Sequence, residues 1–167
     1  YQFSKELFEY RPSKLPIFIQ HAPHVVAMHD SPSNVIRKMK ETSIKVAVDL
    51  AKQGEVSSLV SAGNSGAAMA LAMYIFRKLE GVDRPAIATV HPTPKGSTVL
   101  IDSGGNVDCK AFHLVQFAIM GDAYGKYILG EQEPRIGLLS NGEEEGKGNE
   151  LTREVHEILS QTNLNYI

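Results

Sequence analysis

The sequence predicts a layered α/β protein, with helices on both sides of a mixed, mostly parallel sheet. Short apolar segments typical of strands alternate with helical segments, without repeats or low-complexity linkers. The 167 residues are 43% hydrophobic and 22% charged, which suits one domain with a hydrophobic core and argues against disorder. We therefore interpret 1–167 as a single α/β domain. We expect it to be incomplete at both ends, because it begins without Met and closes on Tyr166-Ile167, typical of a strand entry.

The first half of the chain carries clear helix boundaries. Ser31 before Pro32 is typical of an N-cap followed by proline at the first helical position, and this helix extends to about residue 40. Thr42 or Ser43 caps the next helix, which Gly54 ends. In all, helices are expected at 2–9, 32–40, 43–53 and in the apolar run 67–76, with strands at 16–20, 25–28 and 59–60. The run 67–76 is apolar on nearly every face, so we expect other protein to cover it, such as a second subunit.

The second half begins with a hairpin. Segments 86–91 and 97–102 flank the turn-rich stretch PTPKG, which predicts an antiparallel pair. A helix follows over 113–129, in which Gly121 and Gly125 are four residues apart and indicate close packing. A buried strand is expected at 135–140. The last helix is predicted to bury one face formed by Leu151, Val155, Ile158 and Leu159.

Three polar loops follow predicted strands: 61–66, 103–112 and 141–149. Open α/β sheets bind ligands beyond the carboxyl ends of their strands. The loops are therefore the first place to look for a functional site.

Loop 61–66 is rich in glycine and precedes a helix. Gly63 and Gly66 allow the backbone to approach a ligand, Asn64 and Ser65 add side-chain donors, and the helix dipole favours an anion. A tight turn with an N-cap explains the same residues equally well. The spacing is not that of a dinucleotide fingerprint.

The stretch DSGGNVDCK (102–110) supplies polar groups of several kinds. Asn106 and Lys110 are candidate ligand-binding residues, and Asp102 is expected to cap a neighbouring helix. Cys109 with His113 resembles a thiol nucleophile and its base, but a single cysteine is more often a small buried residue.

The loop NGEEEGKGNE (141–150) resembles a phosphate-binding Walker A loop but lacks its spacing and its final Ser/Thr, so we reject that motif. Its adjacent glutamates indicate a solvated loop before a helix rather than a magnesium site. Lys147, next to glycines, can reach a phosphate.

Charge and cysteine content exclude several classes of protein. The net charge is -2, without the basic stripe of a nucleic-acid binder. One cysteine excludes an internal disulfide and a cysteine-rich metal site, and fits a reducing compartment, so cytoplasm is expected. Basic residues gather at the junction of two predicted helices, where they form either a solvated face or a docking surface for an acidic partner: Arg37, Lys38, Lys40 and Lys45.

Four stretches together resemble the bacterial phosphate acyltransferases of phospholipid synthesis: VSAGNSGAAMA, GVDRPAIATV, DSGGNVDCKAFHLVQFAIMG and RIGLLSNGEEEGKGNEL. The resemblance covers nearly the whole chain and looks like the central part of a family member. Met39 replaces an expected basic residue, Thr42-Ser43 an expected serine pair, and Ser65 an expected threonine.

The resemblance implies transfer of a fatty acyl group from acyl carrier protein to inorganic phosphate, without a cofactor. It also implies a fold similar to phosphotransacetylase and the isocitrate and isopropylmalate dehydrogenases, a homodimer, and peripheral membrane association with contact to a membrane glycerol-phosphate acyltransferase. Phosphate is itself the nucleophile in such a reaction, so no acylated serine or cysteine is needed.

Together these arguments assign the expected site. Asn64, Asn106 and Lys147 are the expected catalytic residues, and no metal is expected. Phosphate is expected at Gly63, Asn64, Ser65, Gly66, Lys110 and Lys147, and carrier docking at Arg37, Lys38 and Lys40. The alternatives are a short-chain phosphotransacetylase or related dehydrogenase, and a non-catalytic module that binds an acyl carrier or a membrane.

Overall fold

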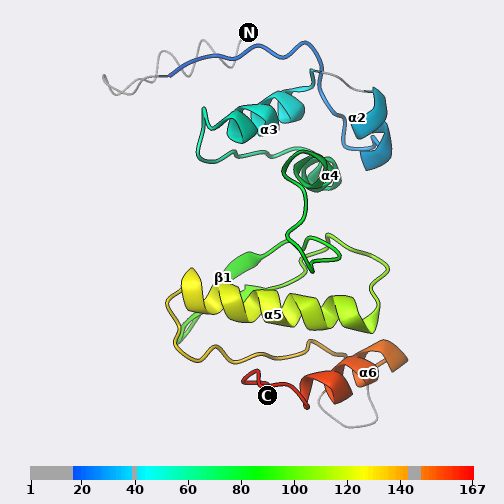
Figure 1. Ribbon diagram of the computed structural model, residues 1–167, viewed down its shortest axis with the longest axis vertical. Helices are drawn as coiled ribbons and strands as arrows, with labels where there is room; N and C mark the ends of the chain where they lie inside the picture. The colour runs from blue at the N-terminus through cyan, green and yellow to red at the C-terminus, as the bar shows by residue number, and fades with distance from the viewer. Residues whose placement is uncertain (1–16, 39–40, 143–147) are drawn as a thin grey trace.

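The computed structural model describes residues 17–38, 41–142 and 148–167, and the elements within them form two groups along the longest axis (Figure 1). The first group contains α2 (Pro32–Lys38), α3 (Ser43–Gln53) and α4 (Ser65–Phe76). The second contains β1 (Thr89–Thr93), β2 (Gly96–Leu100), α5 (Ala111–Tyr127) and α6 (Glu150–Leu159). Among these elements, each packs only within its own group, and residues 77–88 connect the two.

Local capping determines the helix boundaries of the first group. Helix α2 begins at Pro32, as predicted, and is described as far as residue 38. The Thr42 hydroxyl accepts a hydrogen bond from the Lys45 N–H at 3.3 Å and caps α3. Gly54 ends that helix with φ of 78°, in the left-handed region that glycine adopts readily. Both predicted ends of α3 are confirmed.

The core of the first group lies where its three helices meet. Helices α2 and α3 both pack on α4. The buried residues of this core are Val35, Ile44, Val48, Ala67 and Leu71, and Val26 and Leu59 pack against them. Burial of each larger aliphatic side chain contributes roughly 1.5–3 kcal/mol.

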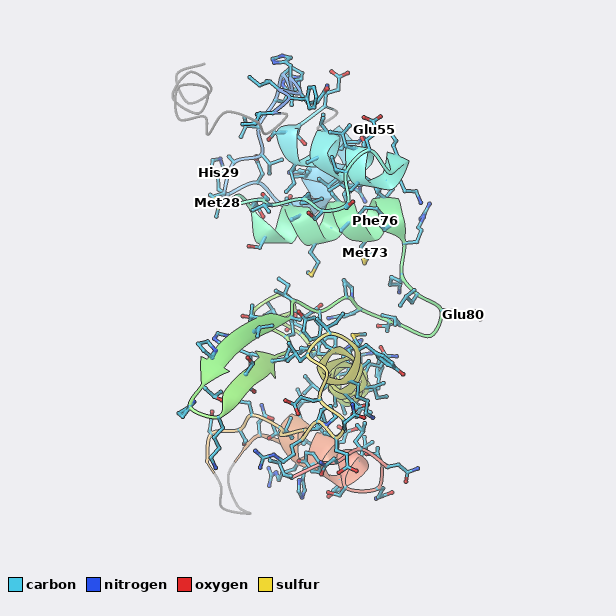
Figure 2. All side chains as sticks on the ribbon, turned by 90° about the vertical axis from the view of Figure 1, so that its left-hand side faces the viewer. Met28, His29, Glu55, Met73, Phe76 and Glu80 are labelled. Carbon is cyan, nitrogen blue, oxygen red and sulfur yellow. The ribbon has the colours of Figure 1, made fainter. Side chains whose placement is uncertain are left out.

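Helix α4 is covered on one side only. Ala67 and Leu71 face the core, whereas Met73, Tyr74 and Phe76 are exposed. Figure 2 shows Met73 on the side of α4 that faces the second group. The helix is confirmed, and its cover by a second subunit stays a prediction.

The second group is built on the predicted hairpin. Strands β1 and β2 pair antiparallel from Thr89 opposite Leu100 to Thr93 opposite Gly96, which confirms the pair. Helix α5 packs on β2, and α6 packs on α5. Its core contains Ala111, Val155 and Leu159, with Leu151 partly buried beside them. Ile158 belongs to the predicted buried face of α6 but is 38% exposed.

One of the two glycines in α5 makes a close approach. A Cβ on Gly125 would lie 2.8 Å from Pro134 Cγ, whereas one on Gly121 would meet Ile101 only at 3.8 Å. The close contact is therefore with the loop after α5 and not with another helix.

The predictions of strands at 16–20, 25–28, 59–60 and 135–140 are wrong for the described residues of these segments, which begin at 17 and form no regular strand. A strand forms only where another chain segment pairs with its backbone. Within the described ranges, two isolated parallel bridges occur nearby: His24 with Thr42, and Ile136 with Tyr166. The fold is thus α/β with a small antiparallel sheet, and a layered, mostly parallel sheet stays a prediction. The predicted helix at 2–9 lies outside the described residues.

Candidate functional site

Asn64 connects the first polar loop to other segments through several hydrogen bonds of its side chain. Its side chain is buried, and its Oδ1 accepts a hydrogen bond from the Ala67 N–H at 3.0 Å, which caps α4. Its Nδ2 lies 3.2 Å from the carbonyl oxygens of Ala27 and Met28 and 3.0 Å from that of Asp30. Both amide hydrogens are therefore engaged with a turn more than 30 residues earlier in the chain.

The backbone at the start of α4 keeps donors that an anion can use. The N–H groups of Ser65 and Gly66 lie in the first turn, before the intrahelical hydrogen bonds begin. A Cβ on Gly66 would lie 3.2 Å from Pro32 Cγ, so this position packs closely against α2. The Gly63 N–H donates to the Ser61 hydroxyl at 3.2 Å. Of the predicted phosphate-binding residues here, Ser65 has an exposed side chain.

Asp102 accepts several hydrogen bonds at the start of the second polar loop. Its Oδ1 accepts from the Ile87 N–H at 2.8 Å, and its Oδ2 accepts from the Asn106 N–H at 2.6 Å. A Cβ on Gly105 would lie 2.7 Å from Asp102 Oδ1, so the loop passes too close for any side chain there. The expectation that Asp102 caps a helix is wrong, because its carboxylate accepts hydrogen bonds from loop N–H groups.

Asn106 is also engaged with protein atoms. Its Nδ2 donates to the Pro85 carbonyl at 2.9 Å and to Asp102 Oδ2 at 3.0 Å. The side chains of Asn64 and Asn106 thus do the same job in the two groups, since each holds a loop to a distant backbone segment.

Lys110 is the N-cap residue of α5, and His113 holds its backbone. The Lys110 N–H donates to His113 Nδ1 at 2.9 Å, which leaves the ring proton on Nε2. His113 Nε2 lies 2.7 Å from Asp83 Oδ2 and donates to it. The hydrogen bond from His113 lowers the pKa of the Asp83 carboxyl below its ordinary value. The imidazole itself is 2% exposed.

Cys109 cannot use His113, the base predicted for it, in the structure described. Both ring nitrogens of His113 are engaged, with Lys110 and with Asp83. Burial raises the pKa of the Cys109 thiol, which keeps it protonated and weakly nucleophilic at neutral pH. The geometry therefore favours a reaction without an acylated cysteine.

An open groove of about 510 Å³ lies between the start of α5 and the outer face of α6. Four of its lining residues are apolar and three are charged: Ala111, Phe112, Leu151 and Ile158, with Lys110, Glu150 and Glu154. Among these described residues Lys110 is the only cation. The groove therefore combines an apolar surface with one lysine, on the α5 side, and two glutamates, on the α6 side.

The predicted site residues do not all meet. Lys110, at the end of the second loop, lines the groove together with the start of α6, the helix that follows the third loop. Asn64 lies in the first group, whose described elements make no contact with α5 or α6. Lys147 lies outside the described residues, although Gly148 at the end of its loop packs against α6, where a Cβ would lie 2.5 Å from Thr152 Oγ1.

The predicted docking residues belong to α2 and the segment after it. Arg37 is exposed on α2, and Lys38 is the last residue of that helix. Lys40 lies outside the described residues. Lys45, in α3, forms an ion pair with Asp49 one turn later, so part of its charge is compensated within the helix.

Asp83 is a site residue that sequence reasoning missed. It lies 30 residues before His113, and neither periodicity nor spacing connects the two. The available signal was a histidine three residues after the cap of α5, where a capping box normally has Glu or Gln.

In the part of the chain that the structure describes, no cluster of side chains suited to a metal ion is found. No described helix has the length and apolar character to cross a membrane.

The chain is similar to known proteins over nearly its whole length. A family model described as "Fatty acid synthesis protein" matches residues 2–167. A relative from Syntrophotalea carbinolica is 57% identical over 161 residues, covering 96% of this chain and 46% of the relative. Relatives from Geotalea uraniireducens and Geobacter sulfurreducens are each 55% identical, covering 98% and 96% of this chain and 47% and 46% of themselves. All three are named "Phosphate acyltransferase", and this chain spans about half their length.

Proposed function

The chain belongs to the family of fatty acid synthesis proteins, and from this we propose that the whole protein transfers a fatty acyl group from acyl carrier protein to inorganic phosphate. One observation carries the proposal: more than half of the aligned residues are identical to those of proteins named phosphate acyltransferase, over nearly the whole chain. Acyl carrier protein as the acyl donor is what the resemblance to the phosphate acyltransferases implies.

The reaction needs no covalent intermediate on the protein. A phosphate oxygen attacks the thioester carbonyl carbon, and the tetrahedral intermediate collapses with loss of the carrier thiolate, which takes up a proton. A C–O bond replaces a C–S bond, giving acyl phosphate and the free carrier thiol. The protein must hold phosphate against the carbonyl and stabilise the oxyanion, for which one donor contributes about 2.7–4 kcal/mol.

Lys110 is the described residue best suited to the phosphate. Its backbone is held at the start of α5, and its side chain lines a groove that also offers Phe112, Leu151 and Ile158. An acyl phosphate presents the matching pair, an anionic head and an apolar chain. Glu150 and Glu154 disfavour an anion on the α6 side, so we assign the anionic group to the α5 side.

The remaining predicted residues take roles within this proposal. Ser65 and Gly66 offer first-turn N–H groups, with Gly63 shaping the loop before them, and Lys147 supplies a second positive charge. Asn64 and Asn106, whose amide hydrogens bind protein carbonyls, act by holding the two loops. For both loops to contact one phosphate, the two groups must come together in the whole protein.

The broader expectations complete the proposal. The whole protein forms the layered α/β/α sandwich with a mostly parallel sheet, works as a homodimer in the cytoplasm and associates peripherally with the membrane. Arg37, Lys38 and Lys40 bind the acidic carrier protein by charge complementarity. Contact with a membrane glycerol-phosphate acyltransferase would deliver the product to its consumer.

The test is phosphate-dependent loss of the acyl-carrier thioester in the whole protein, with acyl phosphate trapped by hydroxylamine. Lys110→Ala should raise the phosphate concentration needed for half-maximal rate by about 10- to 100-fold, because a charge-assisted contact is lost. Lys95→Ala is the matched control, since Lys95 lies in the hairpin turn between β1 and β2 and does not line the groove. Acetyl-coenzyme A as the preferred donor would identify a phosphotransacetylase, and nicotinamide reduction would identify a dehydrogenase. Carrier binding without acyl phosphate would identify a non-catalytic module.

Carrier docking has its own test. Arg37→Glu should weaken carrier binding and flatten its dependence on salt, because exposed charge pairs are screened by ions. Lys95→Glu makes the same change of charge in the other group and should leave binding unchanged. Equal affinities for wild type and Arg37→Glu across a salt titration would make Arg37 part of a solvated face only.

A further inference from the structure

Residues 77–88, the connection between the two groups, form hydrogen bonds with the first turns of α5. His113 Nε2 donates to Asp83 Oδ2 at 2.7 Å, and one turn later Gln116 Oε1 accepts from the Asp83 N–H at 3.0 Å. Gln116 Nε2 donates to the Gly81 carbonyl at 2.7 Å. Positions three apart lie on the same face of a helix, so both side chains bind the connection from one face.

The same imidazole also holds Lys110. Because His113 Nδ1 accepts from the Lys110 N–H at 2.9 Å, one buried ring joins the connection on one side to the lysine on the other. His113 is 2% exposed, so water does not compete for either nitrogen. Asp83 orients the ring by accepting a hydrogen bond from Nε2–H, which leaves Nδ1 as an acceptor.

A second residue of the connection holds the segment just before the lysine. Arg84 Nη1 donates to the Asp108 carbonyl at 2.7 Å. The backbone is thus held two residues before Lys110 by Arg84 directly, and at Lys110 by His113, which Asp83 binds in turn. The Lys110 side chain is left to line the groove.

We propose that Asp83 and His113 are positioning residues that hold Lys110 in place for phosphate. This inference rests on the proposed function. Neither residue touches the reacting atoms: His113 acts through the Lys110 backbone, and Asp83 acts through His113. Their removal should weaken phosphate binding in both ground and transition states, and so raise the KM for phosphate with little change in kcat.

Four substitutions separate the two hydrogen bonds of the ring. His113→Ala removes both and should raise the phosphate KM about five- to tenfold, the equivalent of a lost helix cap. His113→Gln restores the normal capping-box acceptor for Lys110 but loses Asp83, so its KM should rise only about two- to threefold. Asp83→Ala removes the same single bond and should match His113→Gln. Asp83→Asn keeps an acceptor oxygen and should stay near wild type.

Gln116→Ala is the matched control, because it frees the connection on the same face of α5 without touching Lys110. Each variant is assayed in the whole protein at saturating acyl carrier substrate with phosphate varied, and folding is followed by thermal melting. A KM that rises for His113→Ala, recovers with Gln and is unaffected in Gln116→Ala supports the proposal. If the wild type is active and both His113→Ala and Asp83→Ala have the same phosphate KM as the wild type, the positioning role is overturned and the proposed function stands. A wild type that forms no acyl phosphate overturns the proposed function, and this role with it.

Discussion

The two groups each hold a polar loop at the start of a helix, but they use different chemistry. In the first, a neutral amide holds the loop: Asn64 caps α4 and donates to three carbonyls of the turn 27–30. In the second, carboxylates do so: Asp102 accepts loop N–H groups, and Asp83 orients the histidine that holds Lys110.

The difference between an amide and a carboxylate determines which loop responds to pH. An amide has no titratable proton, so the contacts of Asn64 have the same strength at every pH at which the protein folds. Carboxylates accept strong hydrogen bonds only while ionised. The loop that carries Lys110 therefore responds to pH through Asp83, whose pKa the hydrogen bond from His113 lowers, whereas the loop at the start of α4 depends on packing and shape.

The largest expected effect is at Asn64. Asn64→Ala removes a cap and leaves three carbonyls without their donor, which should lower the free energy of unfolding by about 3 kcal/mol. Asn149 is the matched residue in the second group, since it caps α6 through the Thr152 N–H but is exposed. Asn149→Ala should cost about 1 kcal/mol, the value of a cap alone. Urea unfolding of both variants measures the difference.

Equal losses at Asn64 and Asn149 would mean that the contacts of Asn64 with the turn 27–30 add nothing to its cap. The first group would then be held by its apolar core alone.

A glycine in each loop gives the next largest effect. In Gly105→Ala the new methyl would meet Asp102 Oδ1 at 2.7 Å, and the carboxylate is held by two N–H groups and cannot easily move. We expect a loss of about 2–3 kcal/mol in the free energy of unfolding. In Gly66→Ala the closest atom is Pro32 Cγ at 3.2 Å, so about 1 kcal/mol or less is expected.

Gly121→Ala controls for the substitution itself, because Gly121 lies inside α5 with 3.8 Å of space and the change should stabilise the helix by about 0.5–1 kcal/mol. A Gly105→Ala variant as stable as Gly66→Ala would show that the Asp102 carboxylate can move away from the new methyl group at little cost.

A smaller effect is expected from acid. Because the hydrogen bond from His113 lowers the pKa of Asp83 below its ordinary value of 3.8, this carboxylate stabilises the folded state above that pH. The stabilisation is lost as pH falls below 3.8 through the lowered pKa of the folded state. Melting temperatures of wild type and Asp83→Asn should thus differ at pH 7 and converge toward pH 3. A constant difference at every pH would show that ionisation of Asp83 contributes nothing.

The smallest effect is expected at Cys109. Burial raises the pKa of its thiol, and its neighbour His113 has no free nitrogen, so Cys109→Ala in the whole protein should keep acyl transfer within about twofold. Alkylation by iodoacetamide at pH 7 should also be slower than that of a free thiol. A trapped acyl-cysteine during turnover would contradict this mechanism.

Local residue chemistry was sufficient for the start of α2 and for both ends of α3. A cap at Thr42 or Ser43, the Gly54 stop and the proline at the start of α2 could all be predicted because each acts within four residues along the chain. The PTPKG hairpin followed for the same reason, since its strands are joined by a short turn. The sequence also indicated the family and the candidate status of Lys110.

Only the tertiary structure decided what the polar residues of the loops do. Asn64 was predicted to bind an anion, and only the structure shows that its amide also binds carbonyls more than 30 residues away. Asp83 could not be connected with His113 by spacing or periodicity, because the two residues lie 30 positions apart. The apolar runs at 59–60 and 135–140 were compatible with strands, but a strand exists only where a second segment pairs with it. Hydrogen bonds between distant segments depend on how the chain packs, and no local pattern of residues encodes that partner choice.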